Sequence, residues 1–317
     1  METTVLFYNV ENLFDTLDDP LTNDNAFLPG SALKWHQKRY VLKLQRIARV
    51  LKEVEDPMPG IVGLAEIENR KVLEDLVTVL GLTEDEVGIV HIDSPDRRGI
   101  DVAMLYRKDL FQISEFTNLP IHFSSNPRDK TRDILYVQLN HKDYSPLHFY
   151  VNHWPSRKEG MKASQVKRFD AAKTLCKHLD NLLAKESEAM VLSMGDMNCT
   201  PDSPPVYRVL DQKGNPDNPL VNLSWDIHYA KSGSTNYRGK WLMFDQILAT
   251  QNLLNHSTVK LLNPPPVKLL NFKVVSFPWM LFYNPKYKDF RPNKTYGGSK
   301  YHGGYSDHLP VKALLRF

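Results

Sequence analysis

Short apolar runs separated by polar stretches recur along the chain and predict β-strands. The runs comprise residues 3–10, 61–65, 101–106, 110–116, 134–139, 147–151, 190–194, 244–249 and 311–315. They are rich in β-branched and aromatic residues, and polar residues, glycine or proline bound them, as is typical of strands in a sheet. The continuous apolar run 61–65 indicates a strand that is covered on both faces.

Three other stretches repeat their apolar residues at helical spacing. Residues 41–51 place Val41, Leu44, Ile47 and Leu51 on one face among many lysines and arginines. This spacing predicts an amphipathic helix, and we expect the basic face over residues 38–52 to be solvated. Residues 72–80 and 163–183 are also predicted to be helical. Residues 18–31, which contain Asp, Asn, Pro and Gly, predict a loop.

The arrangement of these elements predicts one domain that spans residues 1–317. A length of 317 residues would allow two domains. However, the chain shows no internal repeat or linker, and the prolines at 264–266 favour a rigid loop over a domain boundary. Strands of mixed kind interleaved with a few helices favour two β-sheets packed face to face with helices outside. The predicted fold class is therefore a layered α/β sandwich.

Composition and charge exclude several classes of protein. The 42% of apolar residues and the mixed charge exclude collagen, coiled coils and disulfide-stapled miniproteins. The two cysteines, Cys176 and Cys199, form no zinc-binding spacing and are expected to be structural thiols. A net charge of +3 neither requires nor excludes a polyanionic partner.

The apolar runs are too short to cross a membrane. The longest, residues 274–283, is interrupted by Ser276 and Pro278, whereas a spanning helix needs about 20 apolar residues. Strand-like sequence begins by Thr4, which leaves no room for a signal peptide in this chain. We expect a soluble protein, either cytoplasmic or secreted after removal of a leader, and leave its compartment open.

Polar clusters at the ends of the predicted strands carry the candidate chemistry. The six clusters are Asn9-Val-Glu11, Glu66-Ile-Glu68-Asn69, Asn152-His153-Trp-Pro155, Gly195-Asp196-Met-Asn198, Asp245-Gln246 and Ser306-Asp307-His308. A single such cluster is more often a cap or a turn than a functional site. Six in succession, each at a strand end, indicate one active site built from several strands.

The ordered motifs FYNVEN, GLAEIEN, RRGIDVAMLYR, NHWPSR, SMGDMNCTP, KWLMFDQIL and GGYSDHLPV resemble the endonuclease/exonuclease/phosphatase superfamily, which includes deoxyribonuclease I. The resemblance covers the chain from Phe7 to the motif at Tyr305 and is strongest to a bacterial branch. It implies a four-layer sandwich of two mixed sheets flanked by helices, and metal-dependent cleavage of a phosphoester.

Such cleavage requires positive charge near the phosphoryl oxygens and the leaving group. Mg²⁺ prefers hard oxygen ligands and usually takes one or two carboxylates, and Mn²⁺ or Ca²⁺ are alternatives. Glu66 is the first choice for this ligand, as the resemblance also implies, with Asp307 assisting and Asn9 orienting a ligand or water. Glu11 would share a face with Asn9 on a regular strand and is a further candidate ligand.

The resemblance places His308 and Asp245 where water is activated. A carboxylate that accepts from one imidazole nitrogen raises the basicity of the other, so that His308 can act as a base. Asp196 would orient the water or serve the leaving group, and the Asn198 amide would bind a phosphoryl oxygen; these two roles could be exchanged. By resemblance, His153 is expected to contact the phosphate as a cation or an acid; the alternative is a buried, hydrogen-bonded histidine.

Three arginines are candidate phosphate ligands, because a guanidinium group is permanently charged and can bind two oxygens at once. They are Arg98, Arg132 and Arg157, although surface arginines are often simply solvated. In the segment that holds Arg132, Asp133 replaces the proline expected from the resemblance.

The predicted function is a nuclease or phosphodiesterase that hydrolyses DNA or nucleotide phosphodiesters, in a protein expected to be monomeric. A phosphatase of inositol phosphates or lipids is the alternative within the same fold, and a binding module without turnover lies outside enzymology. Residues 286–300 mix basic and aromatic side chains, which suits single-stranded nucleic acid. A loop that packs these aromatic rings on the sandwich explains the same pattern.

Overall fold

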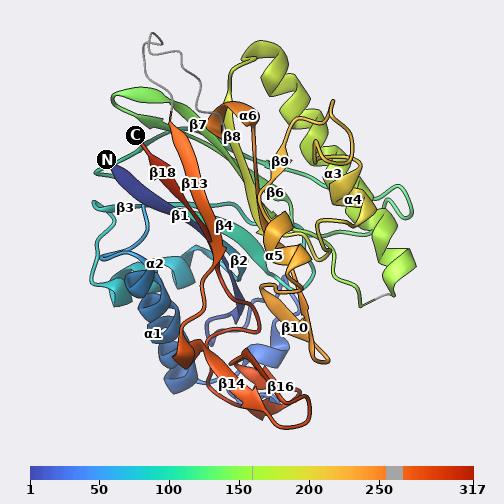
Figure 1. The fold of residues 1–317 in the computed structure, drawn as a ribbon. Helices are drawn as coiled ribbons and strands as arrows, with labels where there is room; N and C mark the ends of the chain where they lie inside the picture. The colour runs from blue at the N-terminus through green and yellow to red at the C-terminus, as the bar shows by residue number, and fades with distance from the viewer. Residues whose placement is uncertain (159, 255–266) are drawn as a thin grey trace.

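The computed structural model describes residues 1–158, 160–254 and 267–317. It contains two six-stranded mixed sheets (Figure 1). The first consists of β13 (Lys268–Val274), β18 (Val311–Arg316), β1 (Glu2–Leu13), β2 (Ile61–Ile67), β4 (Asp101–Arg107) and β3 (Val87–His91), in that order. The second consists of β5 (Gln112–Leu119), β6 (Ile134–His141), β7 (Tyr144–His153), β8 (Met190–Asp196), β12 (Asp245–Ala249) and β9 (Val221–Asn222).

The sheets pack face to face because their strands alternate between two buried faces. On β1, Val5 and Phe7 point into the core between the sheets, whereas Leu6 and Tyr8 point to the opposite face. On β7, Phe149 joins the same central core. Burying both faces explains why these strands are almost continuously apolar.

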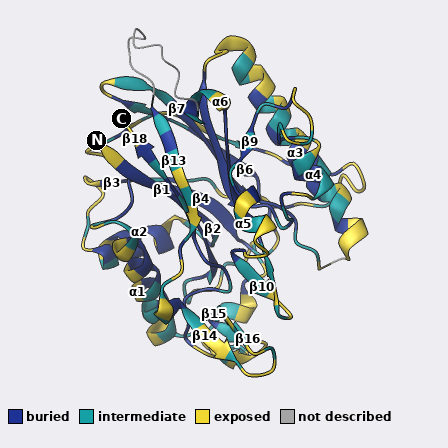
Figure 2. Cartoon of the chain, in the orientation of Figure 1, coloured by how far each residue is buried: buried dark blue, intermediate teal, exposed yellow. Residues whose placement is uncertain are grey.

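Helices cover the outer face of each sheet and complete the four layers. The helices α1 (Gln37–Val54) and α2 (Arg70–Leu80) pack on the first sheet, and α3 (Met161–Lys185) packs on the second beside the short α4 (Pro204–Tyr207). Figure 1 shows the two sets on opposite sides of the sheets, and Figure 2 shows their exposed outward surfaces around the buried strands. The predicted four-layer sandwich is confirmed.

Short elements complete the described chain. They are η1 (Asn25–Phe27), α5 (Trp225–Tyr229), β10 (Thr235–Tyr237), β11 (Lys240–Leu242), α6 (Gln251–Leu254), η2 (Pro278–Met280), β14 (Leu281–Asn284), β15 (Asp289–Pro292), β16 (Tyr296–Gly297) and β17 (Lys300–Tyr301). Three two-stranded hairpins, β10–β11, β14–β15 and β16–β17, lie at one end of the sandwich (Figure 1). The proline run 264–266 lies outside the described residues.

The basic face of α1 differs from the solvated surface that its sequence predicts. Arg39 lies 4.0 Å from the ring centroid of Tyr301, and Arg49 lies 4.1 Å from that of Trp279. Lys43 is buried. Arg39 and Arg49 stack on aromatic rings from the C-terminal region, whereas Lys38 and Lys52 are exposed, so this face is solvated only in part.

Among the described helices, none is long and apolar enough to cross a membrane.

Candidate active site

The strand ends that carry the polar clusters meet at one edge of the sandwich. Because β7 and β8 are parallel, His153 lies opposite Asp196. The antiparallel β12 begins at the same edge, where Asp245 also pairs with Asp196. In the other sheet, Asn9 at the end of β1 pairs with Ala65, next to Glu66. The two parallel pairs therefore bring the predicted side chains together.

The backbone is irregular where these strands end. Four residues there have left-handed backbone angles: Glu11 (φ 55°), Asn12 (φ 56°), Glu66 (φ 67°) and Asn198 (φ 48°). The β1–β2 register also shifts between Asn9 and Leu13. Such conformations are uncommon outside glycine and concentrate at functional sites. The regular alternation used to place Glu11 on the same face as Asn9 therefore does not hold here.

Asn9 connects carboxylates from the two sheets. Its Nδ2 donates to Asp196 Oδ2 at 3.1 Å and, at 3.4 Å, to Glu66 Oε1. Its Oδ1 accepts the backbone N–H of Glu11 at 3.0 Å. This buried amide fixes the relative position of the two carboxylates. It thus serves as an orienting group, and its role toward a metal stays a prediction.

Asp245 and His308 form a close pair. His308 Nδ1 lies 2.6 Å from Asp245 Oδ2, and His308 Nε2 lies 3.9 Å from Asp196 Oδ2. Burial favours the neutral imidazole, but the Asp245 and Asp196 carboxylates outweigh it and raise the pKa of His308 well above its ordinary value. Burial raises the pKa of Asp196 to about 6, against the opposing charge of His308.

Like His308, His153 lies close to the Asp196 carboxylate. Its Nε2 lies 3.6 Å from Asp196 Oδ2 and 3.8 Å from Glu66 Oε1. Burial lowers the pKa of His153 well below its ordinary value, and the charges of Arg132 and Arg98 add to this shift. This shift favours the neutral imidazole, and its Nδ1 is buried without a hydrogen-bond partner among the described residues. The contact of His153 with the phosphate stays a prediction.

Glu66 and Asp307 supply oxygen atoms that fit a hard cation. Glu66 Oε2 accepts the backbone N–H of Asn12 at 2.9 Å, while its Oε1 has only long contacts, at 3.4 Å with Asn9 and at 3.8 Å with His153, among the described residues. The half-buried Asp307 carboxylate accepts no hydrogen bond from any described residue. Burial raises the pKa of Asp307; His308 opposes this shift and the Glu66 carboxylate adds to it. Two neighbouring, poorly compensated carboxylates are a ligand set that Mg²⁺ prefers.

Glu11 is engaged by the backbone. Its Oε2 accepts the N–H of Thr295 at 2.6 Å, and its Oε1 accepts that of Tyr296 at 3.4 Å. Burial and the nearby Asp307 raise the pKa of Glu11 to about 7. Its carboxylate therefore anchors the segment before β16, and its direct ligation of a metal stays a prediction.

Lys43 is a buried cation that the sequence analysis missed. Its Nζ donates to Thr295 Oγ1 and to the carbonyl of Tyr305, each at 2.7 Å. Burial lowers its pKa to about 8, although Glu11 and Asp307 oppose this shift. The available signal was its position, because residue 43 lies on the apolar stripe of α1 with Tyr40 and Ile47.

Asn198 and Arg157 are linked on the second sheet. The Asn198 side chain donates to the carbonyl of Trp154 at 2.9 Å and, at 3.3 Å, to Asp196 Oδ2. Arg157 Nε donates to the carbonyl of Asn198 at 2.9 Å, and its guanidinium lies 4.6 Å from the ring centroid of Phe244. These two contacts hold the guanidinium group of Arg157 beside the predicted site.

The other two arginines have protein partners. Arg132 is buried and donates to the carbonyls of His153 and Trp154, each at 2.8 Å, and to Asp96 at 3.3 Å. Arg98 Nη2 donates to Asn12 Oδ1 at 2.5 Å. Arg132 therefore holds the backbone of His153 in place, and a direct contact of either arginine with phosphate stays a prediction.

A cleft of about 680 Å³ opens beside these residues. Its lining includes Asn198, Asp307 and His308 on one side. The other lining residues are Arg157, Lys158, Met161, Thr235, Asn236, Tyr237, Leu242, Phe244, Phe282, Asn284, Arg291, Pro292 and Lys294. A substrate in this cleft would reach the exposed edge of His308.

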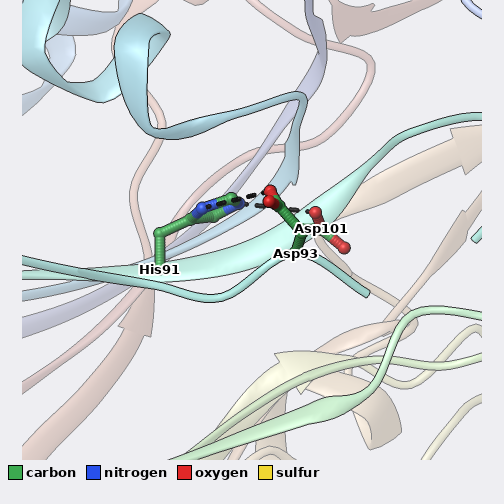
Figure 3. Close-up of side chains that lie close together, drawn as sticks. All are labelled: His91, Asp93 and Asp101. Carbon is green, nitrogen blue, oxygen red and sulfur yellow. Dashed lines mark ion pairs between the residues drawn. The ribbon is translucent and has the colours of Figure 1, made fainter. Parts of the chain in front are cut away.

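A second histidine and aspartate group lies outside that lining, at the ends of β3 and β4. His91 Nε2 lies 3.4 Å from Asp101 Oδ2, and His91 Nδ1 lies 3.8 Å from Asp93 Oδ1 (Figure 3). Asp101 Oδ1 also accepts the backbone N–H of Ser94 at 3.1 Å. These contacts fasten both ends of the loop that carries Asp96 and Arg98.

Comparison with known proteins agrees with the four-layer fold. Residues 4–316 match the model of the Endonuclease/Exonuclease/phosphatase family. No curated protein matches the chain. Similar solved structures include an endonuclease/exonuclease/phosphatase family protein from Bacteroides thetaiotaomicron, with 15% identity and a TM-score of 0.58 over 99% of this chain and 97% of that one.

Two further structures share the fold. Truncated TDP2 from Caenorhabditis elegans has 16% identity and a TM-score of 0.57, covering 100% of this chain and 98% of that one. A mannosyl-6-phosphatase from Bacteroides thetaiotaomicron has 16% identity and a TM-score of 0.59, covering 99% of this chain and 100% of that one.

Proposed function

The chain belongs to the Endonuclease/Exonuclease/phosphatase family, and on this premise we propose that it is a metal-dependent phosphoesterase that hydrolyses phosphodiesters of DNA or nucleotides. The observation that carries the proposal is the pair formed by His308 and Asp245. Their 2.6 Å contact fixes the orientation of the imidazole, while His308 lines the cleft. A histidine held in this way can exchange a proton with water or with a phosphoryl oxygen.

The other residues supply complementary roles. Asp196 lies 3.9 Å from His308 Nε2 and is positioned to orient an attacking water. Asn198 lines the cleft, and its amide would bind a phosphoryl oxygen by giving up the longer of its two hydrogen bonds, the 3.3 Å contact with Asp196. His153, neutral and adjacent to both Asp196 and Glu66, would hydrogen-bond the substrate without repelling a cation.

Glu66 and Asp307 would hold the metal, with Asn9 fixing Glu66 from the side. A divalent cation held by these two carboxylates would neutralise phosphoryl charge and, as a nearby positive charge, would lower the pKa of His308. Mg²⁺ is the proposed ion because the donors are carboxylate oxygens, and Mn²⁺ or Ca²⁺ could replace it.

Hydrolysis of a phosphomonoester is the alternative within the family. The mannosyl-6-phosphatase has the same fold, so the scaffold alone does not select the ester. A phosphatase of inositol phosphates or lipids belongs to this alternative. A binding module without turnover is disfavoured, since all the predicted polar residues at the site are retained.

A metal-supplemented substrate panel tests the proposal. Purified protein is assayed with Mg²⁺ or Mn²⁺ on plasmid DNA, a single-stranded oligonucleotide, methyl p-nitrophenyl phosphate and inositol phosphates. We expect phosphodiester cleavage that EDTA abolishes and added Mg²⁺ restores. Glu66→Gln should raise the Mg²⁺ concentration needed for half-maximal activity, whereas Glu84→Gln, at an exposed position, should not.

Cleavage that persists unchanged in EDTA would reject the metal requirement. Release of phosphate from inositol phosphates without any diester cleavage would favour the phosphatase alternative. Intact substrates throughout, with DNA retained by the protein, would support the binding module.

A further inference from the structure

The cleft beside His308 is larger than the reacting group needs. Its volume of about 680 Å³ lies within the range of about 300–1,000 Å³ that is typical of pockets for whole ligands. Asp307 and His308 line it together with residues of the hairpins β10–β11 and β14–β15, and β10–β11 adjoins His308 through Thr235. A phosphoryl group at His308 would leave most of this space for the rest of the substrate.

In the hairpin β14–β15, one cross-strand pair of side chains lines the cleft and the next pair does not. Phe282 pairs directly with Arg291, and both line the cleft. The next pair, Tyr283 and Phe290, lies outside the lining, with ring centroids 5.5 Å apart. Successive residues of a strand point to opposite faces, so one face of the hairpin combines an aromatic ring with a cation. Phe282 is 37% exposed.

The cleft is strongly positive. Four of its described lining residues are cationic, Arg157, Lys158, Arg291 and Lys294, whereas Asp307 is the acid among them. This imbalance favours a ligand with negative charge beyond the group that reacts.

Arg291 is oriented for an anion. Its guanidinium lies 3.7 Å from the ring centroid of Tyr287, which holds it in place. Its Nε and Nη2 atoms have no hydrogen-bond partner among the described residues. These two atoms are buried, and no carboxylate of the described residues forms an ion pair with Arg291, so its uncompensated charge beside the cleft favours a bound phosphate.

The hairpin β10–β11 presents a second ring and is fixed to the proposed catalytic residues. Tyr237 lines the cleft and is 61% exposed. Thr235 Oγ1 donates to the carbonyl of Asp307 at 2.9 Å, and Thr235 forms a β-bridge with His308. Asn236 Nδ2 donates to Asp289 Oδ2 at 3.5 Å, which joins this hairpin to β15. The aromatic wall is thereby held in a fixed position relative to His308.

We infer that this cleft is a nucleotide subsite for a single strand of nucleic acid. A base adjoining the scissile phosphate stacks on Tyr237 and Phe282, and a neighbouring phosphate pairs with Arg291 and Lys294. Exposed aromatic faces beside cations suit nucleobases joined by phosphates, whereas an inositol or sugar phosphate offers no flat ring to stack. The inference rests on the proposed function and names the substrate class of the same site.

Fluorescence anisotropy of a labelled single-stranded oligonucleotide tests the subsite, with EDTA present to prevent turnover. Stacking on an aromatic side chain contributes enough that Tyr237→Ala and Phe282→Ala should each weaken binding by about 5- to 100-fold. Arg291→Gln should weaken binding and make it less dependent on salt. Phe290→Ala, in the same hairpin but outside the cleft, is the matched control and should bind like the wild type.

An abasic oligomer with the same number of phosphates separates stacking from charge. We expect it to bind more weakly than the oligonucleotide and to be insensitive to Tyr237→Ala. Inositol hexakisphosphate should compete poorly at equal charge concentration. Equal binding of the abasic oligomer, or an effect of Phe290→Ala as large as that of Phe282→Ala, would overturn the inference and indicate a merely basic cleft.

Hydrolysis of methyl p-nitrophenyl phosphate, which carries no base or second phosphate, separates the inference from the proposed function. Each subsite variant should retain this activity within about 2-fold while its kcat/KM for the oligonucleotide falls with the loss of binding. If the wild type hydrolyses no phosphoester, the proposed function fails, and the anisotropy series still decides whether the subsite exists. If the variants hydrolyse methyl p-nitrophenyl phosphate and bind the oligonucleotide like the wild type, the subsite is refuted while the proposed function stands. Thermal unfolding of each variant verifies that it is folded.

Discussion

At the scale of single residues, neighbouring carboxylates have different tasks. Glu66 faces the candidate site, whereas Glu68, two residues later, accepts the backbone N–H of Asp15 at 2.6 Å and is buried. Asn69 caps α2 by accepting the N–H of Val72. Only the first residue of the predicted Glu66-Ile-Glu68-Asn69 cluster therefore faces the chemistry, while the other two polar residues shape the turn that presents it.

Glu68 should make stability depend on pH. Burial raises its pKa from 4.5 to about 8, although the Asp15 N–H opposes this shift. Because the folded pKa lies above the unfolded one, the contribution of Glu68 is fully present below about pH 4.5 and is lost as pH rises through about 8. Glu68→Gln should remove up to about 1.4 kcal/mol per pH unit from the slope of the unfolding free energy in this window.

Urea unfolding at several pH values checks this prediction. The difference between wild type and Glu68→Gln should change steadily between pH 5 and pH 8, with Glu84→Gln as the exposed control. Parallel stability curves for wild type and Glu68→Gln would show that the carboxyl is not protonated in the folded protein.

At the scale of elements, α1 fixes the segment that delivers the last part of the site. Lys43 reaches from α1 to Thr295 and Tyr305, immediately before Ser306-Asp307-His308. Arg46 adds a hydrogen bond of 2.5 Å to the hydroxyl of Tyr305. A helix of the first sheet thus positions a loop that would otherwise be held mainly by its own hairpins.

Replacing Lys43 by Met should loosen this contact. The substitution keeps the length of the side chain but leaves the Thr295 hydroxyl and the Tyr305 carbonyl without their donor. We expect the unfolding free energy to fall by about 2–4 kcal/mol, the cost of two buried polar groups. Chemical denaturation measures this loss. Lys52→Met, at an exposed position on the same helix, is the control, and an equally small loss in both variants would contradict the role of Lys43.

The elements also show what the sequence could predict. Strands covered on both faces, such as β2 and β8, have continuous apolar runs and were predicted near their observed positions. The edge strand β5 begins at Gln112 instead of residue 110, because its exposed residues dilute the apolar pattern. The edge strands β3 and β13 were not predicted. The stacking of Arg39 on Tyr301 was not predictable either, because Tyr301 lies far along the chain from α1.

For the site as well, some features were predictable from the sequence and others were not. Strand ends were sufficient to gather the main candidates. Asn9, Glu66 and Asp196 lie at the ends of strands that pair in parallel, so they meet at one edge. Asp245 starts and His308 precedes an antiparallel strand that begins at the same edge. Side-chain partners were not predictable from spacing. Arg132 turns to backbone carbonyls and Glu11 to backbone N–H groups only because the folded chain brings those groups near.

At the scale of the whole molecule, the two sheets contribute unequal parts of one site. The first sheet supplies Glu66 at the end of β2 and His308 just before β18. The second sheet supplies the other residues proposed to handle water and phosphate, at the ends of β7 and β8 and at the start of β12. The core between the sheets, with Phe7 and Met194 among its buried residues, fixes the distance between these parts. Asn9 crosses that interface to meet Asp196.

The most direct test of this account is the kcat of His308→Ala on a phosphodiester at saturating Mg²⁺, compared with His302→Ala, an exposed histidine six residues away. Loss of a general acid or base lowers rates by about 10²–10⁴-fold, so His308→Ala should lose at least about 100-fold while His302→Ala retains the wild-type rate. A His308→Ala protein that is folded and hydrolyses the diester at the wild-type rate would contradict the account.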